Sequence, residues 1–159
     1  MKTASAVPVL MYHHVGPEAG LVTISPENFR AQMRWLAEHG YRTIGCDDLA
    51  RFLKGEPLPA KSVLLTFDDG YLDNYVYAHP ILAEFSLKAA LFIVTGRIGD
   101  GAARACAGEG AVPETLAHGA CKAAVQAGRA DEVMLRWSEV ERMHAAGTFE
   151  FHSHTHTHT

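Results

Sequence analysis

The sequence predicts an α/β fold in which parallel strands alternate with helices, and three observations lead to this prediction. Short apolar runs such as Val7–Tyr12 and Ser62–Phe67 show no regular polar alternation, which is typical of strands covered on both faces. Helical patterns separate these runs, and strands separated by helices pair in parallel through right-handed crossovers. The length of 159 residues and the 48% hydrophobic content suit one domain with its own core.

The expected elements alternate from the first strand onward, with one irregular insertion late in the chain. Helix starts are indicated by Ser25 with Pro26, by Asp47 or Asp48, and by a capping box that begins at Ser138. The expected strands are Val7–Tyr12, Tyr41–Ile44, Ser62–Phe67, Lys88–Thr95 and Thr148–His152. The expected helices run from Pro26 to a stop at Gly40, from Asp47 or Asp48 to Leu53, and over Asn74–Phe85, Glu114–Ala127 and Ser138–Gly147, with the insertion at Gly96–Pro113.

Charge and hydropathy exclude several classes of protein. The 14 basic and 18 acidic residues give a net charge of −4 without a basic stripe, which argues against nucleic-acid binding. No apolar run is long enough to span a membrane. Val7–Tyr12 is too short for a signal peptide, which slightly favours the cytoplasm unless a leader for export was removed. Cys46, Cys106 and Cys121 show no CxxC spacing, so neither a disulfide framework nor a thiolate zinc site is expected.

Two adjacent carboxylates, Asp68 and Asp69, follow the third expected strand and precede Gly70. Carboxylates at the end of a buried strand are costly unless they are paired, and neighbouring like charges favour protonation unless a cation intervenes. Gly70 allows a sharp turn that would bring both side chains into one pocket. The pair therefore fits one metal ligand and one general base, although a simple turn also explains an Asp-Gly pair.

Four of the ten histidines lie in the last eight residues, at His152, His154, His156 and His158. Imidazole is the commonest ligand of zinc and similar metals, and two histidines four residues apart can converge where a strand coils into a turn. Either His152 with His156 or His154 with His158 has this spacing. Together with the carboxylate pair, they supply two nitrogens, one metal oxygen and one free carboxylate, which suits a catalytic metal site.

The remaining histidines give weaker signals. His13 and His14 follow the first strand, so they could line the same pocket or belong to the core or a loop. Four others fall in expected helices or at helix ends, where we expect solvated side chains. These are His39, His79, His118 and His144.

The sequence resembles the polysaccharide deacetylases with a NodB-homology domain, carbohydrate esterase family 4, over nearly its whole length. Thr66–Gly70, which reads TFDDG, matches the first catalytic motif of that family, and His154–His158 fits the second. Val9–His13, Ser25–Leu36 and Lys88–Ile93 resemble its opening strand, its first helix and a later strand. The resemblance implies a distorted (β/α) barrel of the NodB type, incomplete here, with about five parallel strands.

Under this resemblance, residues 1–159 are the N-terminal portion of one deacetylase domain, with an irregular insertion around residues 96–113. It implies hydrolysis of an N-acetyl, less often O-acetyl, group on a polysaccharide or oligosaccharide by metal-activated water. The ion is divalent, with zinc expected first. On spacing alone, the competing pair of His152 with His156 stays open. The implied roles are general base for Asp68, metal ligand for Asp69, His154 and His158, and substrate-binding or supporting residue for His13, Tyr71, Thr155 and His152.

Domains of this family continue beyond the second motif, with an arginine motif, residues for the acetyl methyl group and a Leu-x-His that supplies the general acid. This chain stops at Thr159, so we expect an incomplete domain with negligible activity and self-association through an open sheet edge. Two alternatives stay open. One is a phosphoesterase-like or amidohydrolase-like barrel, whose His-x-His strand resembles residues 151–155, and the other is an inactive metal-binding or carbohydrate-binding remnant.

Overall fold

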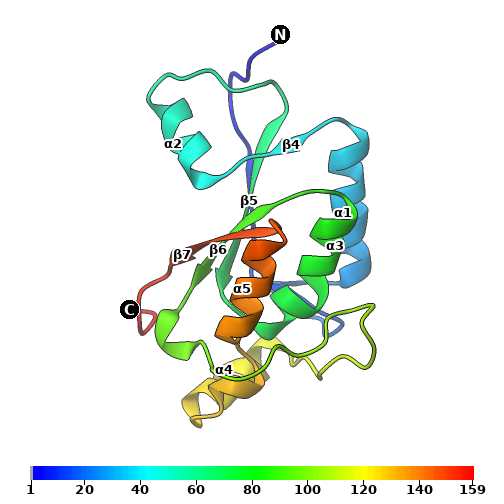
Figure 1. Ribbon diagram of the computed structural model, residues 1–159, viewed down its shortest axis with the longest axis vertical. Coiled ribbons are helices and arrows are strands. Elements are labelled where there is room, and N and C mark those ends of the chain that lie inside the picture. Colours follow the sequence, from blue (N-terminus) through cyan, green and yellow to red (C-terminus); the bar gives the residue numbers. More distant parts are fainter. Residues whose placement is uncertain (1) are drawn as a thin grey trace.

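Five parallel strands form the central sheet of the computed structural model, which describes residues 2–159 (Figure 1). Their order is β1-β5-β6-β7, and β4 pairs with the start of β5. The predicted alternation of parallel strands and helices is confirmed. The strands are β1 (Val9–Tyr12), β4 (Arg42–Thr43), β5 (Ser62–Asp69), β6 (Ala89–Ile93) and β7 (Phe149–Ser153).

Five α-helices connect or flank these strands. None of the helices among residues 2–159 has the length and hydropathy needed to span a membrane. A small two-stranded sheet, β2 (His14–Val15) with β3 (Thr23–Ile24), was not expected from the sequence. The helices are α1 (Pro26–Glu38), α2 (Cys46–Leu53), α3 (His79–Glu84), α4 (His118–Gln126) and α5 (Trp137–Ala145). A π-helical turn at Asn74–Ala78 leads directly into α3, and 3₁₀ turns lie at Thr95–Arg97 and Ala130–Glu132.

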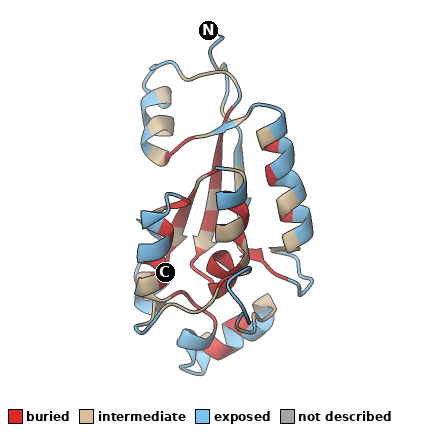
Figure 2. Cartoon of the chain, turned by 45° about the vertical axis from the view of Figure 1, so that its right-hand side comes forward, coloured by how far each residue is buried: buried red, intermediate tan, exposed pale blue. Residues whose placement is uncertain are grey.

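The main core lies between one face of the sheet and helices α1, α3 and α5 (Figures 1 and 2). Phe29 and Met33 of α1 are fully buried there, and so are Phe67 of β5 and Met143 of α5. Burying a side chain of this size contributes roughly 1.5–3 kcal/mol. This packing holds the carboxyl ends of the strands, where the candidate functional residues lie, in a fixed arrangement.

The other face of the sheet is covered only in part. Ile44 packs with Leu64 and Ala90, and Leu49 of α2 lies against this small cluster. Met11 on β1 stays 65% exposed. Within residues 2–159, β1 and β7 each have one edge without a strand partner, so the sheet does not close. This open sheet agrees with the incomplete barrel implied by the family resemblance.

Three predicted helix starts are wrong. Helix α2 begins at Cys46, after Gly45, and not at Asp47 or Asp48. Helix α5 begins at Trp137, and the Glu139 carboxylate accepts the Arg136 N–H at 2.9 Å, while the expected cap Ser138 donates to a loop carbonyl. Helix α4 begins at His118 instead of Glu114. At α5 the capping carboxylate is that of Glu139, which caps Arg136 and not Ser138, and α4 begins without a side-chain cap.

The expected insertion is irregular, and α5 anchors it. Residues 98–113 contain no helix or strand. Arg104 pairs with the fully buried Glu139 through Nε at 2.8 Å and Nη2 at 2.9 Å. The same guanidinium donates to the Met134 carbonyl at 2.7 Å. These bonds satisfy a buried charge and fix the loop above the carboxyl ends of the strands.

Candidate metal centre and catalytic site

Asp68 and Asp69 are the last two residues of β5, so the strand extends beyond its predicted end at Phe67. Successive strand side chains point to opposite faces, and Asp69 turns away from the ideal strand with φ of +77°. Aspartate tolerates this left-handed region better than most residues. Gly70 follows with φ of +87°, and a Cβ there would lie 3.0 Å from Ile93 Cγ2. The sharp turn thus involves both residues and buries Asp69.

His154 and His158 are brought together by the turn that follows β7. Thr155 has φ of +66°, and its Oγ1 accepts the N–H of His158 at 2.9 Å. The His154 N–H donates to the Ile93 carbonyl at 2.7 Å, which fixes this turn beside β6. The two imidazole rings lie 5.0 Å apart between their centroids. Thr155 therefore acts in the structure as a positioning residue for the turn.

The Asp69 carboxylate lies against both of these rings. Its Oδ1 is 3.6 Å from His154 Nε2 and 3.1 Å from His158 Nε2. Asp69 is only 4% exposed, and Oδ1 has no hydrogen-bond partner. A buried carboxylate oxygen without a partner is costly, and a cation removes that cost. One ligand atom from each of the three residues lies within 4.8 Å of the other two. The donor set of two nitrogens and one oxygen suits a zinc-type ion.

The competing pair of histidines lies elsewhere. His156 Nδ1 is 3.0 Å from Thr95 Oγ1, and His152 Nε2 is 3.0 Å from Glu150 Oε1. The structure thus brings Asp69 together with His154 and not with His152. The phosphoesterase-like alternative would need His152 and His154 in one group of ligands. The structure places them in two different groups.

Asp68 lies beside this group of ligands without belonging to it. Its Oδ2 is 3.7 Å from His13 Nε2, and both side chains are about a quarter exposed. His13 follows directly after β1, the strand that pairs with β5. The site therefore contains a partly exposed carboxylate and imidazole outside the group of Asp69, His154 and His158.

A pocket of about 160 Å³ opens next to Asp69 and His158. Tyr71 lines it and is itself 3% exposed, because its ring stacks on His14 with centroids 3.9 Å apart. His118 also lines the pocket and is half-buried there, less solvated than expected for a helix-end histidine. Burial lowers the pKa of His118, and so does the neighbouring His14. Tertiary packing of α4 against the strand ends brings this histidine into the site.

A buried chain of hydrogen bonds supports this side of the pocket. His14 is 1% exposed, and its Nδ1 lies 2.6 Å from Asp73 Oδ2. Its Nε2 lies 3.0 Å from His118 Nδ1. Sequence reasoning did not identify Asp73 as a functional residue. The only local indication of this hydrogen-bond chain was the adjacent pair His13-His14. The sequence does not show that the ring of His13 lies beside Asp68 while that of His14 lies beside Asp73.

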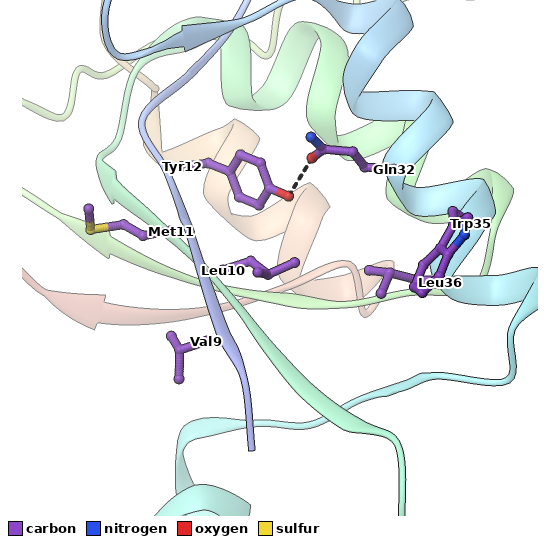
Figure 3. Close-up of a pocket in the computed structure, with 7 residues that line it drawn as sticks. All are labelled: Val9, Leu10, Met11, Tyr12, Gln32, Trp35 and Leu36. Atoms are coloured by element: carbon purple, nitrogen blue, oxygen red, sulfur yellow. Dashed lines mark hydrogen bonds between the residues drawn. The ribbon is translucent and has the colours of Figure 1, made fainter. Parts of the chain in front are cut away.

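The larger hollow in the surface is elsewhere. A groove of about 440 Å³ lies between β1 and α1, where Tyr12 donates to Gln32 Oε1 at 2.8 Å (Figure 3). Its other lining residues are mostly apolar, and no carboxylate or histidine is among them. Because the groove contains no carboxylate or imidazole to bind a metal, the candidate site is the one at the strand ends.

The chain belongs to the polysaccharide deacetylase family, whose model matches residues 55–159. A Bacillus subtilis (strain 168) protein named as a polysaccharide deacetylase, YxkH, is 38% identical over 94 residues, covering 58% of this chain and 33% of that protein. Poly-beta-1,6-N-acetyl-D-glucosamine N-deacetylase of Escherichia coli (strain K12) is 36% identical over 84 residues, covering 50% of this chain and 12% of that protein. The chain thus spans a third or less of the length of these curated relatives.

Two solved structures share the fold. The Streptococcus pyogenes deacetylase PplD, in complex with acetate, has a TM-score of 0.69 at 27% identity, with 96% of this chain and 57% of that chain covered. IcaB from Ammonifex degensii has a TM-score of 0.68 at 26% identity, covering 94% of this chain and 53% of that chain. These likenesses confirm the predicted family and the fold of the NodB type.

Proposed function

We propose that the protein is a metal-dependent hydrolase that removes acetyl groups from an N-acetylated polysaccharide, with O-acetyl groups as the less favoured substrate. The observation that carries the proposal is the free Asp68 carboxylate beside Asp69, His154 and His158, where the buried Asp69 oxygen has no partner. Membership in the deacetylase family supports it, and the names of several relatives point to N-acetylglucosamine polymers.

In this proposal Asp69, His154 and His158 hold one divalent ion, with zinc expected first. When bound, such an ion polarises the acetyl carbonyl and lowers the pKa of its water. The task of these three side chains is to hold it firmly at the carboxyl ends of β5 and β7. The hydrogen bond of Thr155 to the turn keeps His158 in place.

Asp68 takes the proton of the attacking water. It lies next to the group of ligands, while its own oxygens stay free to accept that proton. His13, whose Nε2 is 3.7 Å from Asp68, is placed to orient this carboxylate or to contact the substrate. General acid–base help of this kind is worth about 10²–10⁴-fold in rate.

The test is acetate release from oligomers of N-acetylglucosamine by a version of the domain extended with the arginine and Leu-x-His motifs of the family, stripped with a chelator and reloaded with Zn²⁺. Residues 1–159 alone should show negligible release. We expect release only after reloading, with no hydrolysis of a phosphate ester in a parallel assay. Phosphate release without acetate release would favour the phosphoesterase-like alternative. Absence of acetate release from the reloaded, folded, extended version would contradict the proposal.

A further inference from the structure

His152 does not belong to the candidate metal centre, but its ring is held in place by two other side chains. Its ring stacks on Phe92, with centroids 5.2 Å apart. Its Nε2 points to Glu150 Oε1 at 3.0 Å. Both β7 residues have side chains that are about one-third exposed. They lie on the face of the sheet that the main helices do not cover.

A cysteine from a distant part of the chain completes this group. Cys46 is the first residue of α2, and its N–H donates to Glu150 Oε1 at 2.7 Å. One ligand atom each from Cys46, Glu150 and His152 lies within 4.8 Å of the other two. Gly45 permits this close approach, since a Cβ there would lie only 2.5 Å from Glu150 Oε2.

We propose that Cys46, Glu150 and His152 form a second metal site, which binds one divalent ion of the zinc type. Tetrahedral zinc with these ligands places neighbouring ligand atoms about 3.3–3.8 Å apart, so the donors need to move by about 1 Å at most. A thiolate with an imidazole selects zinc-like ions over magnesium or calcium. The fourth position stays open to water or to another ligand.

This second site is separate from the candidate metal centre. In the sheet register, Asp68 lies beside Phe92, and Phe92 lies beside His152. Neighbouring strands are about 4.8 Å apart, which puts His152 about 10 Å from Asp68 along this row. The second site shares no ligand with Asp69, His154 and His158, and it does not depend on the proposed deacetylase activity.

Two simpler roles for Cys46, Glu150 and His152 can be compared with metal binding. Glu150 could serve only as a cap for α2 and as a partner of His152, and then the Cys46 sulfur would have no role. Cys46 could instead be a nucleophile, but burial and the neighbouring Glu150 raise the pKa of its thiol to about 12. A thiol with that pKa is a poor nucleophile at neutral pH. A metal ion would displace its proton to solvent.

The experiment is a titration of the metal-free protein with Co²⁺, followed by absorption spectroscopy. A cobalt–thiolate bond gives an intense near-ultraviolet charge-transfer band, which a site of two histidines and one aspartate cannot produce. We expect this band in the natural protein and in the double variant His154→Ala/His158→Ala. We expect two ions per chain by elemental analysis in the natural protein and one in that double variant.

Variants of each ligand separate metal binding from folding. Cys46→Ser and His152→Asn should lose the band and one ion, while circular dichroism stays that of the natural protein. Glu150→Gln still accepts the Cys46 N–H, so it should keep the fold and weaken cobalt binding at least tenfold. The matched control is Cys121→Ser, because that buried thiol donates to the Leu116 carbonyl and a hydroxyl can do the same.

The outcomes that would overturn the second site are equally specific. They are no charge-transfer band in the natural protein, a band that persists in Cys46→Ser, or a band that is lost in Cys121→Ser. Loss of the band in the His154→Ala/His158→Ala variant would also overturn it, because the thiolate ligand would then depend on the first site.

Discussion

The two candidate metal sites differ in how their carboxylates are satisfied. Glu150 in the strand already accepts the Cys46 N–H and faces His152. Asp69 Oδ1 accepts no hydrogen bond, although His158 Nε2 lies 3.1 Å away, and the residue is held at positive φ. The first arrangement is complete as a helix cap and ion pair, whereas the second leaves a polar group unsatisfied. Buried polar groups without partners and strained backbone concentrate at functional sites.

This difference indicates what each site gains from an ion. At Asp69 the ion removes the cost of an unpaired buried oxygen, so binding should be tight. At Glu150 the ion has to compete with an existing hydrogen bond and ion pair, and it has to displace the proton of a thiol. Metal binding at the second site should therefore be weaker than at the first, and it should depend more strongly on pH.

The largest expected effect is on catalysis at the first site. In the version extended with the downstream family motifs, Asp68→Asn should lower acetate release by about 10²–10⁴-fold because the base is lost, while the protein keeps its ion. Acetate assays and metal analysis on the same sample measure both quantities. Metal loss in Asp68→Asn, together with retention in Asp69→Asn, would show that the two roles are exchanged.

The next effect distinguishes the pair of His154 with His158 from the competing pair of His152 with His156. His154→Ala and His158→Ala should each weaken metal binding at the first site by more than the 10–100-fold typical of supporting residues. His156→Ala is the matched control, because that ring contacts Thr95 and not Asp69, and it should keep both ions. Loss of the first ion in His156→Ala would mean that His152 and His156 bind the metal.

A third effect concerns the stability of the protein without metal. Glu150→Ala leaves the Cys46 N–H without its partner, so the free energy of unfolding should fall by about 1–3 kcal/mol. Asp69→Asn removes a buried charge and keeps a residue that tolerates positive φ, so it should change stability little. Urea unfolding with a chelator present measures both. Equal losses would remove the contrast between the two sites.

The smallest effect concerns the open face of the sheet. Met11 on the edge strand β1 is 65% exposed, and we expect the protein to self-associate through this edge. Met11→Lys should shift sedimentation toward the monomer. Leu53→Lys is a control at a residue that is 76% exposed on α2, away from the edge. A protein that is already monomeric, or an equal shift in both variants, would contradict this prediction.

The sequence alone determined the alternating fold and the family, and it predicted a short set of candidate residues for the first site. These follow from local signals: apolar runs, cap residues, the Asp68-Asp69-Gly70 turn, and a spacing of four residues between histidines. Local signals suffice there because strand ends in a parallel sheet meet at one edge, so residues that follow two nearby strands converge. The choice between His154 with His158 and His152 with His156 needed the structure, because both pairs have the same spacing.

Only the tertiary structure decided which distant side chains join these motifs. Cys46 meets Glu150 and His152 because β4 delivers α2 to the uncovered face of the sheet, over a separation of about one hundred residues. His118 reaches the pocket because α4 packs against the strand ends. Such contacts depend on strand register and on helix docking. No periodicity or spacing in the sequence encodes them, since the hydrophobic burial that produces them is non-directional.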